Sequence, residues 1–149
     1  MTGPLAGLRV IELCDELGQL AGKLLADMGA EVIKVEPPSG STARAVGPFV
    51  DDIPGLNRSL NFWYHNTNKR SAVLDLESEA GAAAWKALVS KADIIIEDRP
   101  PGVLDRLGLG HRSLLPGGAR GGAVAIEERG QDALDCVVAR RVVALVAMA

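Results

Sequence analysis

The chain has 149 residues and 48% of them are apolar, which is the length and composition of one globular domain. Its net charge of -3 is small and its basic residues are scattered, which argues against a nucleic-acid or membrane surface and favours small-molecule or protein partners. Cys14 and Cys136 have no second Cys or His at metal-ligand spacing, so we expect free thiols. The N-terminus has no secretory signal pattern, and the apolar run 136–149 is too short to span a bilayer, which predicts a cytoplasmic protein.

Residues 8–13 form a short β-prone run that is followed by apolar residues at helical spacing. The apolar positions are Leu17, Leu20, Ala21, Leu24, Leu25 and Met28. This pattern predicts a strand and then an amphipathic helix whose apolar face packs on a sheet. Asp15 is expected to cap the helix, and Gly29 to end it before a second strand over residues 31–35. So compact a unit predicts a parallel strand pair with a right-handed crossover.

The second half of the pattern repeats the alternation of strand and helix. Residues 37–61 have the composition of a loop, and their length makes them a candidate substrate entrance. A strand is expected over 71–76, a helix over 79–92 and a β-branched strand over 93–96, then a short helix after Pro100. The fold class predicted is therefore α/β, a doubly wound parallel sheet with helices on both faces.

In such a sheet, ligands bind beyond the carboxyl ends of the strands. This rule selects Cys14, Asp15, Glu16, Leu17, Glu36, Pro37, Leu76, Glu77, Asp98 and Arg99. A dinucleotide site is one alternative, because Glu36 lies about 20 residues beyond the first strand, where an acidic residue would meet a ribose. The loop after that strand argues against it, because it lacks a glycine series and Glu16 would repel a pyrophosphate.

Four blocks of the sequence, in this order, are PLAGLRVIEL, LLADMGAEVIKVEPPSG, NTNKRSAVLDLES and ADIIIEDRPPGVLDRLGLG. From about Pro4 to Leu115 the chain resembles the N-terminal region of family III CoA-transferases. That group includes formyl-CoA transferase, carnitine CoA-transferases and α-methylacyl-CoA racemase. The resemblance implies an acyl-CoA or CoA partner, no metal or redox cofactor, and a homodimer for the full-length family.

The resemblance also implies which residues contact CoA. The matching positions are Glu16, Leu17, Pro37, Leu74, Asp75, Leu76, Glu77, Asp98, Arg99 and Arg106. Guanidinium groups suit this role at Arg99 and Arg106, because they offer paired donors to phosphates.

Other positions have weaker cases for a role at the site. Asp15 and Glu16 depart from the family, which often has His or Gln there, so the usual acyl-site chemistry is in doubt. The block Asn68, Lys69 and Arg70 is a turn into the third strand or a ligand contact. Trp63, Tyr64 and His65 are candidates for an acyl pocket, although core packing explains the aromatic residues better.

The character of the sequence changes after Leu115. The family mechanism uses an Asp nucleophile that forms an aspartyl-CoA thioester, and no residue here has its surroundings, so we assign no catalytic residue. We expect residues 1–115 to be the CoA-binding part, and 116–149 to be an atypical tail from a frameshift or truncation, with a possible helix over 132–149. Three hypotheses remain: a fragment inactive alone, a CoA-binding module or subunit completed by another chain, and an unrelated doubly wound nucleotide-binding protein.

Overall fold

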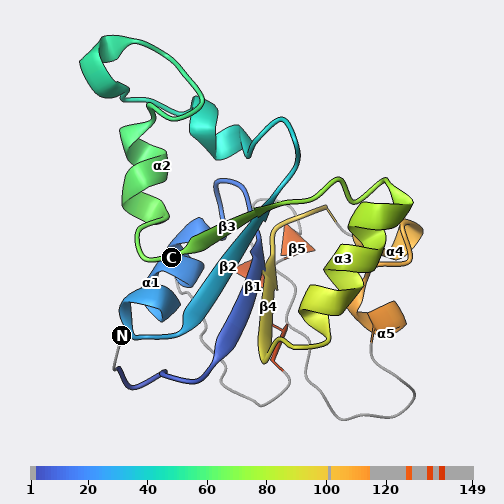
Figure 1. The fold of residues 1–149 in the computed structure, drawn as a ribbon. Helices are drawn as coiled ribbons and strands as arrows, with labels where there is room; N and C mark the ends of the chain where they lie inside the picture. The colour runs from blue at the N-terminus through green and yellow to red at the C-terminus, as the bar shows by residue number, and fades with distance from the viewer. Residues whose placement is uncertain (1–2, 101, 115–126, 129–133, 136–137, 140–149) are drawn as a thin grey trace.

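The computed structural model describes residues 3–100 and 102–114, together with three short strands at 127–128, 134–135 and 138–139. In the described part of the chain, four of the five strands of the main sheet are parallel and lie in the order β3-β2-β1-β4. They are β1 (Arg9–Leu13), β2 (Glu31–Glu36), β3 (Arg70–Val73) and β4 (Ile94–Glu97). This order, in which the chain moves outward from β1 to β3 and then crosses to β4, is that of a doubly wound sheet (Figure 1).

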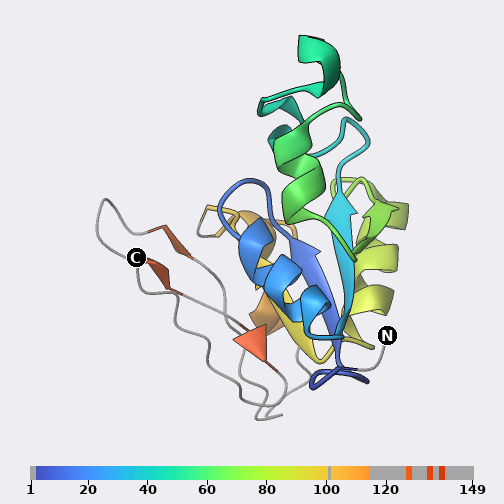
Figure 2. The same cartoon turned by 90° about the vertical axis from the view of Figure 1, so that its left-hand side faces the viewer.

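Helices cover both faces of the sheet (Figure 2). Successive residues of a strand point to opposite faces, so Val10 packs under α1 (Gln19–Asp27), whereas Ile11 packs under α3 (Glu79–Val89). Two short helices, α4 (Val103–Arg106) and α5 (His111–Leu114), lie on the α3 side of the sheet. The predicted α/β class and parallel sheet are therefore confirmed.

α1 buries only part of the predicted apolar face, since Ala21 and Leu25 pack against the core. Leu17, Leu20 and Leu24 are 59%, 45% and 44% exposed, whereas Gln19, Gly22 and Ala26 are buried. A Cβ atom on Gly22 would lie 1.7 Å from a carboxylate oxygen of Glu12, so the helix approaches the sheet closely at this residue. Asp15 does not cap α1, whose N-cap is Gly18 without a side-chain cap. The expected cap is wrong, because the Asp15 carboxylate bonds to Ser41, Thr42 and Arg99 instead. The expected face is buried only in part, because small and polar residues of α1 lie over Glu12.

The segment between β2 and β3 projects from the carboxyl edge of the sheet (Figure 1). It contains two 3-10 turns, η1 (Thr42–Ala45) and η2 (Val50–Asp52), and the helix α2 (Leu60–His65). Trp63 and Tyr64 are 51% and 62% exposed, so core packing is wrong as an explanation for them. Asn68 has the left-handed conformation (φ 65°), as a turn into the third strand requires.

The remaining strands are β5 (Glu127–Glu128), β6 (Leu134–Asp135) and β7 (Val138–Ala139). β5 pairs with β6, and β7 pairs antiparallel with the free edge of β4. The helix expected over 132–149 is therefore wrong at the positions of β6 and β7. The rest of that helix, most of the tail and the proposed frameshift fall outside the described residues. In the described part of the chain, no helix has the length and apolar character needed to cross a membrane.

Candidate ligand site at the carboxyl edge of the sheet

The loop between β1 and α1 (residues 14–18, the β1–α1 loop) is held by Asp98, the first residue after β4. The Asp98 carboxylate accepts hydrogen bonds from the backbone N–H of Asp15 at 2.9 and 3.0 Å and from that of Gly18 at 3.3 Å. In nucleotide-binding proteins of this architecture, N–H groups at this place meet a pyrophosphate. Here a carboxylate of the chain itself occupies them, which disfavours pyrophosphate binding.

Asp15 connects three segments at the same edge. One of its oxygens accepts a hydrogen bond from Arg99 Nη1 at 2.9 Å, and the other accepts hydrogen bonds from the Ser41 hydroxyl and from the Thr42 backbone N–H. The loops that follow β1, β2 and β4 are therefore joined through one carboxylate. The Arg99 side chain is 29% exposed, so part of its guanidinium faces solvent beside the junction.

Glu36, the last residue of β2, is buried with a full set of partners. Arg44 donates to both carboxylate oxygens, at 2.6 and 2.9 Å, and the Ser71 hydroxyl and the Ser41 backbone N–H donate as well. Burial raises the pKa of this carboxyl, but the hydrogen bonds outweigh burial and lower the pKa to about 2. Because its oxygens are occupied within the chain, Glu36 is a structural anchor of the β2–β3 segment and a poor ribose ligand.

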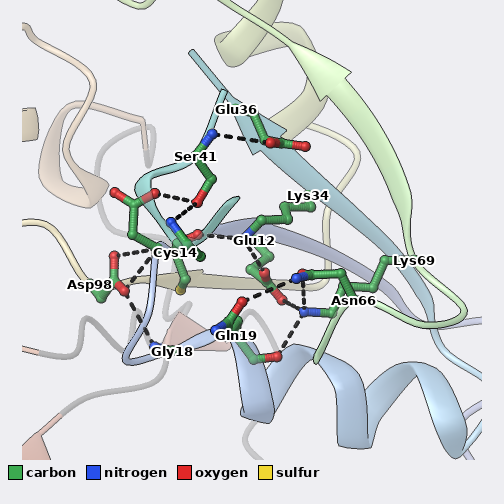
Figure 3. Close-up of polar contacts among 12 residues, drawn as sticks. Glu12, Cys14, Gly18, Gln19, Lys34, Glu36, Ser41, Asn66, Lys69 and Asp98 are labelled. Carbon is green, nitrogen blue, oxygen red and sulfur yellow. Dashed lines mark hydrogen bonds and ion pairs between the residues drawn. The ribbon is translucent and has the colours of Figure 1, made fainter. Parts of the chain in front are cut away.

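A second charged cluster lies beneath the β1–α1 loop (Figure 3). Glu12 is fully buried between two lysines: Lys34 Nζ is 3.0 Å from one carboxylate oxygen and Lys69 Nζ is 2.7 Å from the other. Lys34 also donates to the carbonyl of Cys14, and Lys69 to that of Gln19. Sequence reasoning missed this cluster. A signal was present, since Glu12 and Lys34 each stand between two large apolar residues within a strand, and the structure pairs them in register.

The environment of this cluster changes the acidity of two neighbouring groups. Burial, followed by the carboxylates of Glu12 and Asp98, raises the pKa of the Cys14 thiol well above its usual value. Burial also lowers the pKa of Lys69, against the opposing effect of Glu12. A thiol with a raised pKa is a poor nucleophile, so Cys14 is a packing residue at this edge.

The predicted CoA-contacting residues differ in how far their side chains are exposed. Glu16 and Leu17 are exposed on the β1–α1 loop, and Pro37 is half-buried after β2. Leu74 and Leu76 pack against the core on the α3 side, and the Leu74 N–H donates to the Glu36 carbonyl at 2.9 Å.

The other predicted CoA-contacting positions lie beyond β3 and on α4. Asp75 and Glu77 are exposed beyond β3. Arg106, at the end of α4, has an exposed side chain that forms no ion pair with any described residue.

The remaining candidates have local roles. His65 bonds through Nδ1 with the carbonyl of Asn61, one turn earlier in α2, and this contact accounts for it without a ligand. Arg70 pairs with Glu31 at the opposite, amino-terminal edge of the sheet. Among the described residues there is no group of three or more His, Cys, Asp or Glu side chains arranged to hold a metal ion.

Comparisons with known proteins agree on one family. The family model described as CoA-transferase family III matches residues 5–116. The succinyl-CoA:(R)-benzylsuccinate CoA-transferase subunit BbsE of Thauera aromatica is 43% identical over 112 residues, which cover 75% of this chain and 27% of that protein. The succinate–glutarate CoA-transferase of Agrobacterium fabrum is 49% identical over 116 residues, covering 74% of this chain and 29% of that protein.

The solved structures give the same result. The crystal structure of a CAIB/BAIF family protein from Brucella suis superposes with a TM-score of 0.69 at 40% identity, over 76% of this chain and 30% of that one. A structure of the hypothetical protein Rv3272 from Mycobacterium tuberculosis superposes with a TM-score of 0.66 at 36% identity, over the same shares. The chain thus spans less than a third of the length of these relatives.

Proposed function

The chain belongs to CoA-transferase family III, and on that premise we propose that it forms a CoA-binding part of an enzyme that transfers CoA between carboxylic acids. The hypothesis of an unrelated doubly wound protein is wrong, because the family model matches most of the chain. The observation that supports CoA binding is the junction at Asp15, where three strand-end loops meet beside the partly exposed guanidinium of Arg99.

Arg99 and Arg106 are the proposed phosphate ligands. Among the described residues, Arg99 bonds only to Asp15, and it does so through Nη1. The other N–H donors of its guanidinium group are left for a phosphate. Arg106 carries a permanent charge with no described ion-pair partner. The other proposed contacts are Glu16, Leu17, Pro37, Leu74, Asp75, Leu76 and Glu77. Asp98 belongs to the same set by position, but both of its oxygens already accept hydrogen bonds from the β1–α1 loop.

For the whole enzyme we propose the route that the family resemblance implies. An Asp carboxylate attacks the thioester carbonyl of acyl-CoA, CoA thiolate leaves, and a mixed anhydride forms. The thiolate then attacks the Asp carbonyl of the anhydride, which releases the donor acid and gives an aspartyl-CoA thioester that the acceptor acid resolves. No described residue has the setting of that nucleophile. Because loss of a nucleophile costs about six orders of magnitude in rate, we expect negligible transfer by this chain alone.

Calorimetric titration of CoA into the full chain tests the binding role. Arg99→Ala and Arg106→Ala should each weaken binding about 10-fold or more, since a hydrogen bond to a charged group contributes about 1.5–3 kcal/mol. Lys86→Ala, an exposed cation on α3 outside the proposed site, is the matched control and should leave the affinity unchanged. No heat of binding with the unmodified chain, or equal affinities for all four proteins, would contradict the proposal.

A second candidate is a subunit that another polypeptide completes. It is favoured by the relative from Thauera aromatica, which is named as a subunit of its CoA-transferase. Co-expression with a polypeptide that matches the remaining part of that relative should then give a stable complex with CoA-transfer activity. The absence of any complex would leave the fragment as the better description.

A further inference from the structure

The β1–α1 loop has no glycine series to shape it, yet its backbone polar groups have partners on two sides. Buried or constrained backbone groups need such partners, because an unpaired one loses the free energy of its bonds to water. The side chains that bond to the backbone of this loop and of Gln19 are all charged. The loop is thus held by charge-assisted hydrogen bonds, which are about twice as strong as neutral ones.

Asp98 supplies the acceptor side. Its two oxygens receive the N–H groups of Asp15 and Gly18, at the two ends of the turn between β1 and α1. One carboxylate therefore fixes the distance between the start of the loop and the N-cap of α1. Because its oxygens are occupied in this way, Asp98 is poorly placed to meet an anionic ligand itself.

The two buried lysines supply the donor side. Lys34 donates to the carbonyl of Cys14, immediately before the turn, and Lys69 donates to the carbonyl of Gln19 at 2.7 Å, immediately after it. Glu12 lies between the two ammonium groups and compensates one of their two charges in the buried site. Asn66 completes the group, since it accepts a hydrogen bond from Lys69 at 2.9 Å and donates one to the Gln19 side chain at 3.0 Å (Figure 3).

We propose that Asp98, Lys34 and Lys69 are positioning residues of the β1–α1 loop. The carboxylate holds its N–H groups, and the two ammonium groups hold the Cys14 carbonyl at its start and the Gln19 carbonyl just after it. They set the place of Glu16 and Leu17, and their consequence for CoA binding rests on the function proposed above. The same arrangement fills the site that a pyrophosphate would use in a dinucleotide-binding relative of this architecture. The phosphates of CoA are then left to the arginines at the rim of the edge.

Hydrogen exchange of the ligand-free full chain tests the positioning role directly. Asp98→Asn replaces one acceptor by an NH2 group that faces backbone N–H donors, so the amides of Asp15 and Gly18 should exchange about 10-fold faster or more. The amides of β1 should keep their protection. Asp93→Asn is the matched control, because Asp93 accepts a hydrogen bond from the Arg9 N–H at the opposite edge of the sheet, also at 2.9 Å. It should leave the loop unchanged.

Lys69→Met is the second variant and keeps the test decisive if Asp98→Asn fails to fold. It removes the bond to the Gln19 carbonyl and leaves Glu12 paired with Lys34, so the cluster becomes neutral. Exchange should again rise by about 10-fold across the loop. Loop amides that exchange as in the unmodified chain, in whichever variants fold, would overturn the proposal.

A CoA titration of the same proteins separates this proposal from the proposed function. If CoA binds, Asp98→Asn should weaken it about 10-fold, whereas Asp93→Asn should not. If the unmodified chain does not bind CoA, the proposed function fails, and the exchange of the ligand-free loop still decides the positioning role. Faster exchange with unchanged CoA affinity would overturn the part of the proposal that links loop position to the ligand.

Discussion

Replacing Glu36 by Gln should destabilise the fold at neutral pH by an amount that disappears in acid. The carboxylate of Glu36 is 2% exposed and accepts hydrogen bonds from Arg44, Ser41 and Ser71. Arg44 in turn lies 3.9 Å above the ring of Phe62, so the ion pair anchors the β2–β3 segment to the sheet. The neutral Gln side chain keeps the size of the residue, but presents one NH2 group to donors.

The magnitude follows from the ionisation of this group. Its pKa falls from 4.5 to about 2 on folding, and each unit is worth about 1.4 kcal/mol, so the charged form contributes about 3 kcal/mol. Because the Arg44 side chain is partly exposed, solvent screening reduces this to roughly 2 kcal/mol. A lowered folded-state pKa gives stability that is present above the unfolded value and is lost as the pH falls. The contribution should thus be complete above about pH 5 and fade towards pH 2.

Urea unfolding followed by tryptophan fluorescence at pH 7, 5, 4 and 3 measures the effect. Glu36→Gln should lower the free energy of unfolding by roughly 2 kcal/mol at pH 7 and by a similar amount at pH 5, and the difference from the unmodified chain should shrink at pH 4 and further at pH 3. Glu77→Gln, an exposed carboxyl after β3, is the matched control and should change stability by less than about 0.5 kcal/mol. A Glu36→Gln deficit that stays the same from pH 7 to pH 3 would refute the reasoning.

The two tryptophans should differ in their importance for stability. Trp85→Ala removes a side chain that is 1% exposed and should cost about 3–5 kcal/mol in urea unfolding, whereas Trp63→Ala, at 51% exposure, should cost less than about 1 kcal/mol; similar costs would contradict the assigned burial. In a Cys136→Ser background, Cys14 should react with an aromatic disulfide reagent at pH 8 only after urea unfolding, because burial raises its pKa. Fast reaction of the folded chain would contradict that placement.

The strands and the fold class were predictable because the signals are local. The apolar runs at 8–13 and 31–35 coincide, within a residue at either end, with β1 (Arg9–Leu13) and β2 (Glu31–Glu36). The prediction for the third strand was the least accurate. The predicted run SAVLDL covers residues 71–76, whereas β3 covers Arg70–Val73. After Val73 the chain leaves the sheet to reach the cap of α3, and no local pattern marks that departure.

For the candidate site, the location of the residues was predictable but their roles were not. That the residues after β1, β2 and β4 meet at one edge follows from parallel topology alone, so Asp15, Asp98 and Arg99 were identified before any contact was known. The roles of these residues were not predictable. The sequence predicts that Asp15 caps a helix, but its carboxylate binds the loops after β2 and β4. The sequence predicts that Asp98 contacts a ligand, but its carboxylate holds the backbone of the β1–α1 loop.

The sequence by itself therefore determined the order of strands and helices along the chain, the two-sided burial of the sheet and the edge at which the loops after β1, β2 and β4 meet, because periodicity and parallel strands carry that information. Only the tertiary structure decided which charges neutralise one another. Glu12 lies 22 positions from Lys34, and Asp15 lies 83 from Asp98, so these contacts depend on strand register and crossover rather than on neighbouring residues. In the folded chain Gly22 of α1 faces the buried Glu12, whereas Leu20 and Leu24 are exposed to solvent.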